Sequence, residues 1–146
     1  MRPIILGMTN PRPGEALAPG VVGSAGWRLW RMVEAACGMT REDYLATFDR
    51  RNLITGTWRR RRTSDTGARF VADLPAGSTV VVLGRDVWEM LGFSPATPGA
   101  EVAAAGSTFI FLPHPSGRNL HYNDALNRWR AGETLAALAR RHKCAA

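Results

Sequence analysis

The sequence has little lysine, little cysteine and no long apolar run. Lys143 is the only lysine among 19 basic residues. Two cysteines cannot form a disulfide framework, and no Cys/His spacing is typical of a zinc site, so we expect free thiols with Cys37 packed in the core. No apolar stretch approaches the ~20 residues of a membrane span, and the one at residues 1–6 is too short for a signal peptide. We therefore expect a cytoplasmic protein that holds no metal and no cofactor.

The excess of basic over acidic residues is the most informative feature of the composition. The 146 residues are 45% hydrophobic and 21% charged, which predicts one globular domain spanning residues 1–146. The net charge is +7 and the isoelectric point is about 10.9. Arginine presents a planar, permanently charged fork that suits phosphates, so we expect an acidic partner, with nucleic acid first. A GC-rich genome would explain arginine in place of lysine, but not the excess of basic residues.

Apolar runs and turn residues predict strands that alternate with helices along the chain. The expected strands lie at about residues 3–6, 48–53, 79–83 and 108–112. The expected helices lie at about residues 24–37, 40–46, 64–74, 85–91 and 124–142, the last one capped by Asn123 or Asp124. Residues 8–23 and 94–105 are predicted to be loops, and Trp88, Trp129 and Phe111 are expected in the core. This order predicts a three-layer α/β/α domain with a mainly parallel four-stranded central sheet.

Polar groups gather where the predicted strands end. In parallel α/β sheets, ligands bind beyond the carboxyl ends of the strands. Asn10 follows the first expected strand, Asn52 ends the second, and His114, Ser116 and Asn119 follow the last. Prolines stiffen both the first and the last of these loops. We predict that residues 7–14 and 113–119 form two halves of one active site.

The residue types at these strand ends narrow the chemistry. They include no carboxylate pair, no thiol nucleophile, no Gly-x-Ser-x-Gly elbow and no phosphate-binding Gly-Lys-Ser/Thr loop. An amide can read the edge of a base as donor and acceptor together. A histidine can donate a hydrogen bond to a developing oxyanion. The set suits a neutral, planar, hydrogen-bonding ligand from which an anion departs.

Three segments of the sequence resemble motifs of the uracil-DNA glycosylase superfamily. Gly7-Met8-Thr9-Asn10-Pro11 is similar to the Gly-Met-Asn-Pro-Gly of the single-strand-selective branch and the Gly-Ile-Asn-Pro-Gly of the mismatch-specific branch. His114-Pro115-Ser116-Gly117-Arg118-Asn119 is similar to their His-Pro-Ser-Pro-Arg-Asn and Asn-Pro-Ser-Gly. Val80-Val81-Val82-Leu83-Gly84-Arg85 is similar to the mismatch-specific strand that ends in Leu-Gly-Lys.

The resemblance implies a monomeric DNA glycosylase that flips a nucleotide out of the duplex and breaks the bond between base and sugar. It implies that Asn10 positions the attacking water and that His114, as a neutral imidazole, stabilises charge on the leaving base. Asn52 would read the pyrimidine. The remaining substrate-binding residues that it implies are Gly7, Met8, Thr9 and Ser116.

The resemblance also implies which residues contact DNA. Ser116 would contact a phosphate or fix its loop, and Gly117 belongs to the same DNA-contacting loop. Arg118, Asn119 and Leu120 would enter the gap left by the flipped base, as wedge residues do. Independently of the resemblance, the positive charge of residues 59–62, which include Arg59 and Arg60, would suit contacts to DNA phosphates. A solvated basic loop explains this run equally well.

Two departures from the motifs support alternatives. Thr9 stands between Met8 and Asn10 and shifts the register of the water-positioning residue, and no aromatic residue occurs from Met8 to Gly26. Asn10 is not a general base, so modest turnover is expected. The first alternative is a catalytically weak or inactive relative that binds DNA or a modified base. The second is an enzyme acting on free nucleotides or hypermodified DNA. The sequence leaves open whether Tyr122 and Asn123 line the site or cap the last helix.

Overall fold

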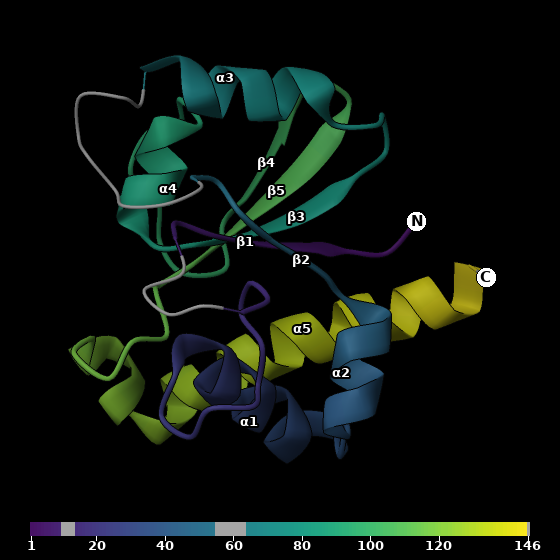
Figure 1. Ribbon diagram of the computed structural model, residues 1–146, viewed down its shortest axis with the longest axis vertical. Helices are drawn as coiled ribbons and strands as arrows, with labels where there is room; N and C mark the ends of the chain where they lie inside the picture. The colour runs from purple at the N-terminus through teal and green to yellow at the C-terminus, as the bar shows by residue number, and fades with distance from the viewer. Residues whose placement is uncertain (10–13, 55–63, 146) are drawn as a thin grey trace.

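The computed structural model describes residues 1–9, 14–54 and 64–145, which form an α/β domain (Figure 1). Its mixed sheet has the strand order β2-β1-β3-β5-β4. The parallel strands are β1 (Ile4–Gly7), β2 (Asp49–Asn52), β3 (Thr79–Leu83) and β5 (Ser107–Leu112). The α/β class and the mainly parallel sheet are as predicted. The parallel registers bring the carboxyl ends of all four strands to one edge of the sheet.

The prediction of four strands was wrong, because a fifth strand lies within the segment expected to be a loop. This strand, β4 (Glu101–Ala104), pairs antiparallel with β5 at the edge of the sheet. A two-residue turn connects them, with positive φ angles of 48° at Ala105 and 74° at Gly106, as type I′ hairpin turns require. β4 offers only Val102 and Ala104 to the interior, and both are half-buried. So short and alanine-rich a strand has almost no signal in its sequence.

Helices pack on both faces of the sheet, consistent with the three layers expected. Alternate residues of each strand point to opposite faces. One face carries Ile5, Val81 and Ile110 into a core shared with α1 (Ala25–Cys37), α2 (Arg41–Thr47) and α5 (Ala125–Ala145). The other face carries Leu6, Val82 and Phe109 into a core shared with α3 (Ser64–Asp73) and α4 (Arg85–Met90). Figure 1 shows α3 and α4 on the side opposite α1, α2 and α5.

The helix boundaries follow the capping residues that the sequence contains. The Ser24 hydroxyl accepts a hydrogen bond from the Trp27 amide at 3.2 Å, and Gly38 ends α1 with φ 71°. Thr40 caps α2 by accepting from the Asp43 amide at 3.1 Å. At α5, the Asp124 carboxylate accepts from the Leu126 amide at 2.8 Å, so Asp124 is the cap of the last helix.

Helices α1 and α5 approach each other closely at Gly132. A Cβ at this position would lie 2.3 Å from the carbonyl oxygen of Met32, so only glycine permits the contact. Trp129, one turn earlier on α5, is 56% exposed, and the prediction that it packs in the core was wrong. It lies on the rim of a groove between the two helices, which the core does not reach. The prediction for Cys37 was also wrong: it is the exposed last residue of α1, and it is a free cysteine.

Within the described residues, no helix combines the length and the apolar character that a membrane span requires.

Candidate active site

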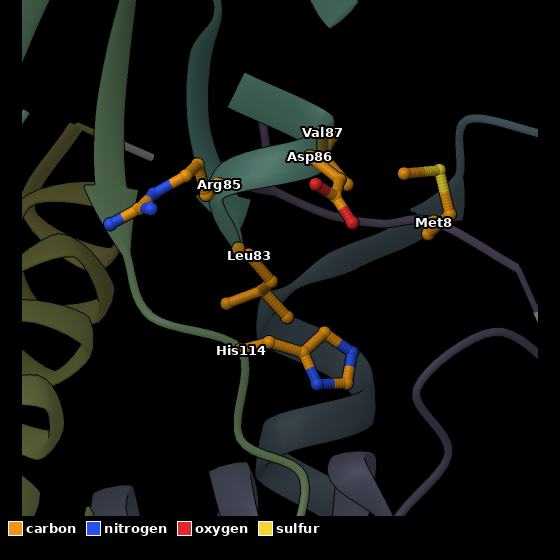
Figure 2. A pocket seen from close by; sticks show the side chains of 7 residues that line it. Met8, Leu83, Arg85, Asp86, Val87 and His114 are labelled. Carbon is orange, nitrogen blue, oxygen red and sulfur yellow. The ribbon is translucent and has the colours of Figure 1, made fainter. Parts of the chain in front are cut away.

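A cavity of about 340 Å³ opens at the carboxyl edge of the sheet (Figure 2). Its walls come from the segments that follow three neighbouring parallel strands. Met8 follows β1, Gly84 follows β3, and His114 lies two residues beyond β5. The other lining residues are Leu83, Arg85, Asp86 and Val87. The cavity therefore brings together residues from both predicted halves of the site.

His114 is the central polar group of this cavity. Its ring projects into the cavity from the segment beyond β5 (Figure 2). Burial lowers the pKa of His114 below its ordinary value of 6.5, and the negative charge of Asp86 offsets part of this effect. The imidazole is therefore neutral at pH 7 and can donate one hydrogen bond from its single ring N–H.

Gly84 allows His114 to approach the end of β3. The Gly84 backbone has φ 95° and ψ 154°, a conformation that is essentially restricted to glycine. A Cβ at this position would lie 3.2 Å from the Cβ of His114. The Gly84 amide also donates to the Leu112 carbonyl at 2.8 Å, which ties the end of β3 to the end of β5. Glycine at this position thus sets the distance between the two walls of the cavity.

The loop that carries His114 is fastened at two points. The side-chain amide of Asn119 donates to the His114 carbonyl at 2.9 Å, while its oxygen accepts from the His121 amide at 3.1 Å. The Tyr122 hydroxyl donates to the Pro113 carbonyl at 2.9 Å. Tyr122 is buried and anchors the loop, so it neither lines this cavity nor caps α5, the two roles that the sequence left open. Asn119, predicted to contact DNA, has its side chain engaged within the protein.

The rest of the predicted wedge lies at the surface. Ser116 is half-buried, and Gly117 and Arg118 are exposed. Leu120 begins a short 3₁₀ helix (Leu120–Asn123) and is 76% exposed, although it is an aliphatic residue. Arg118 and Leu120 therefore both face solvent.

Asn52 lies beside Gly7 at the same edge of the sheet but is not among the lining residues of the cavity. Its side-chain oxygen would be 3.0 Å from a Cβ on Gly7, so the two residues are in close contact. This oxygen is buried and has no hydrogen-bond partner among the described residues. An unpaired buried acceptor costs about 1–3 kcal/mol. Asn52, at the end of β2, thus has an unsatisfied polar atom, and β1 lies between it and Gly84 at the end of β3.

The remaining predicted residues divide between the described and the undescribed parts of the chain. Met8 and Thr9 are half-buried, and the Met8 carbonyl accepts from the Ile54 amide at 2.9 Å, which ties the segment after β1 to the segment after β2. Asn10, Arg59 and Arg60 lie outside the described residues.

Asp86 is the residue of the cavity that sequence reasoning missed. It is the second residue of α4, and its carboxylate points toward the space between Met8 and His114 (Figure 2). Arg85, in contrast, points away from these side chains. A signal was present in the sequence, because Asp86 comes two residues after Gly84, the end of the clearest strand. Asp86 does not itself end a strand, and the prediction from strand ends therefore did not include it.

No cluster of three or more potential metal ligands occurs among the residues that the structure describes. Comparison with models of known protein families gave no match for the chain, and comparison with curated protein sequences also gave none.

Proposed function

We propose that the protein is a DNA glycosylase that excises uracil or a related pyrimidine from DNA. The observation that carries the proposal is a neutral, largely buried histidine on the wall of a cavity of about 340 Å³ at the carboxyl edge of a parallel sheet. This volume lies in the range of small-ligand sites. The motif resemblance gives the cavity its proposed ligand, a base flipped out of DNA.

His114 would act on the leaving base. When the bond between C1′ of the sugar and N1 of the pyrimidine breaks, the electron pair moves into the base and makes it an anion. The ring N–H of His114 donates a hydrogen bond to the oxygen on which this charge develops. Such a donor in a site from which water is excluded contributes about 10²–10³ in rate. A neutral imidazole serves this role without delivering a full proton.

Asp86 would supply the carboxylate that the sequence motifs lack. Water adds to C1′ of the oxocarbenium-like sugar and loses a proton, which Asp86 can accept. The same negative charge favours the positively charged sugar. Asn10 would then position the water without having to act as a base, and the modest turnover expected from Asn10 alone would be raised by Asp86.

The surface around the cavity supports DNA as the partner. Arg118 and Leu120 are exposed on the segment that follows His114, and the net charge of +7 attracts a polyanion. An exposed leucine beside an arginine is suited to fill the gap that a flipped base leaves.

One observation favours a second candidate, a protein that binds a base without excising it. Among the described residues that line the cavity there is no Phe, Tyr or Trp, so the apolar contacts to a base come from the aliphatic side chains of Met8, Leu83 and Val87. A weakly held base would be recognised but positioned too loosely for efficient cleavage.

Excision can be tested with labelled oligonucleotides that contain uracil, hydroxymethyluracil or a thymine–guanine mismatch, in single- and double-stranded form. Alkali breaks the strand wherever a base has been removed. We expect strand breaks with at least one substrate, and a rate about 10²–10³ lower for His114→Ala. Asp86→Asn should lower the rate about 10²–10⁴-fold. Glu89→Gln, which removes an exposed carboxylate of α4 outside the cavity, is the matched control.

Folded protein that binds these oligonucleotides but yields no abasic sites would favour the binding candidate. Equal losses in Asp86→Asn and Glu89→Gln would remove the proposed role of Asp86.

A further inference from the structure

A second concave region, of about 330 Å³, lies between α1 and the first half of α5. It shares no lining residue with the cavity that contains His114 and Asp86. We call it the α1–α5 groove. The two helices run side by side on one face of the sheet (Figure 1). Two tryptophans, Trp27 of α1 and Trp129 of α5, line the groove. Trp129 is more than half exposed, and an exposed indole in a groove offers a flat apolar surface to a ligand.

The charged residues of the groove all have one sign. Arg28, Arg31 and Arg128 line it, and none of the described residues that line it is acidic. A groove that combines two indoles with three guanidinium groups is complementary to a ligand that carries both flat rings and negative charges.

These guanidinium groups are held in place by the protein. Arg128 donates through Nη1 to the carbonyls of Tyr122 and Asn123, at 2.6 and 3.0 Å. Arg28 donates through Nε to the Gly23 carbonyl at 3.1 Å. Arg31 lies over the ring of Trp27, at 5.8 Å from its centroid, and pairs with Glu34. Fixed donors lose less conformational entropy when they bind an anion.

The groove adjoins the loop that carries His114. Tyr122 lines the groove and bonds to Pro113 at the start of that loop. Arg28 reaches Gly117 in the same loop, since a Cβ on Gly117 would lie 2.9 Å from its Nη2. A long, chain-like ligand that is bound along this loop could therefore extend into the groove.

We propose that the α1–α5 groove binds a segment of single-stranded nucleic acid, with bases stacked on Trp27 and Trp129 and phosphates paired with the arginines. Bases of a duplex are already stacked inside the helix, whereas those of a single strand are free to meet an indole. An acidic peptide would satisfy the arginines but leave the indoles uncovered. A second copy would bring the same three arginines against the first. The proposal goes beyond base excision and does not depend on it.

The test is the affinity of the full chain for fluorescein-labelled oligothymidylate without uracil, measured by fluorescence anisotropy at several salt concentrations. Trp129→Ala should weaken binding roughly tenfold, as loss of one stacked base does, and Trp129→Phe should restore most of it. Arg31→Gln should weaken binding several-fold and lower the slope of log affinity against log salt by about one. Arg141→Gln, an exposed arginine near the far end of α5, lowers the net charge equally and should lower the affinity less.

The outcomes separate this proposal from the proposed function. Folded wild type that binds oligothymidylate through Trp129 and Arg31 but releases no base from any pyrimidine substrate would contradict the proposed function and support this proposal. Equal effects of Arg31→Gln and Arg141→Gln would overturn the groove as the binding site, and so would unchanged affinity in Trp129→Ala. Polyglutamate that competes as well as oligothymidylate would overturn base stacking. A dimer that Trp129→Ala dissociates would show that a second copy covers the groove, and it would overturn the proposal as well.

Discussion

The two glycines that flank α4 allow the geometry of the proposed site to be tested against a matched control. Gly84 and Gly92 have φ angles of 95° and 90°, so alanine is strained at both positions. Of the two, only at Gly84 would the new Cβ meet a neighbour, at 3.2 Å from the Cβ of His114, whereas a Cβ on Gly92 would have no described residue within 4 Å apart from its chain neighbours. Gly84→Ala therefore adds displacement of His114 to the strain that a positive φ imposes in both variants.

The expected stability loss follows from opposing contributions. A non-glycine residue in such a conformation costs about 1–3 kcal/mol, and alanine returns about 0.4–1 kcal/mol by restricting the unfolded chain. With the contact to His114 added, we expect a net loss of about 1–2 kcal/mol for Gly84→Ala, which lowers the Tm of a domain of this size by roughly 2–8 °C. Gly92→Ala should lose a similar amount or slightly less, because it lacks the contact with His114.

Activity should separate the two variants. At a temperature where both are folded, by circular dichroism, Gly84→Ala should excise the base about tenfold to 100-fold more slowly, because small displacements of a catalytic group have effects of that size. Gly92→Ala should retain nearly the wild-type rate. Equal rates in the two variants would refute the claim that Gly84 positions His114.

Three further predictions concern His114, its anchor and the helix contact. Because burial lowers the pKa of His114 below 6.5, the unfolded chain binds more protons below about pH 6.5, so stability falls as the pH falls through that value. Urea unfolding at about pH 7.5 and about pH 5 should show a smaller loss for His114→Gln than for the wild type, and an equal loss would contradict the burial effect. Tyr122→Phe should reduce the free energy of unfolding by about 1 kcal/mol, read from the urea midpoint, because it removes the hydrogen bond to Pro113; no change would show that this bond does not hold the loop. Gly132→Ala should lower the Tm, because the new Cβ clashes with the Met32 carbonyl and reduces the free energy of unfolding by about 1–3 kcal/mol. Helix propensity alone favours alanine, so a higher Tm would show that the two helices are not in contact at Gly132.

The sequence predicted the strands that are buried and continuous. Residues 79–83 are β-branched or aliphatic throughout, and a strand covered on both faces needs such a run. The caps Ser24 and Thr40 bond to backbone amides only three residues further on, so the starts of α1 and α2 could be predicted from the sequence alone. The edge strand β4 could not be found in this way, because its pairing with β5 and the type I′ turn determine it more than its own residues do.

The candidate site was predictable in part for the same reason. The carboxyl ends of parallel strands meet at one edge, so Met8 and His114 could be expected together from the order of elements. Asp86 was missed because its orientation depends on how α4 leaves Gly84. The exposure of Trp129 depends on tertiary packing. The bonds of Asn119 are local, to His114 and His121 in the same loop, but the predicted contact with DNA passed over this capping role. Helical spacing placed Trp129 on the apolar face but could not show where α1 stops covering it.

Mass spectrometry of the products from a uracil-containing oligonucleotide tests the central claim most directly. It separates removal of the base from any cleavage of the strand. The proposed function predicts free uracil and an intact abasic strand in equal amounts with the wild-type protein, and only traces of both with folded His114→Ala. Release of free uracil by both proteins at the same rate would contradict the role of His114, and no free base from the folded wild type with any pyrimidine substrate would contradict glycosylase activity itself.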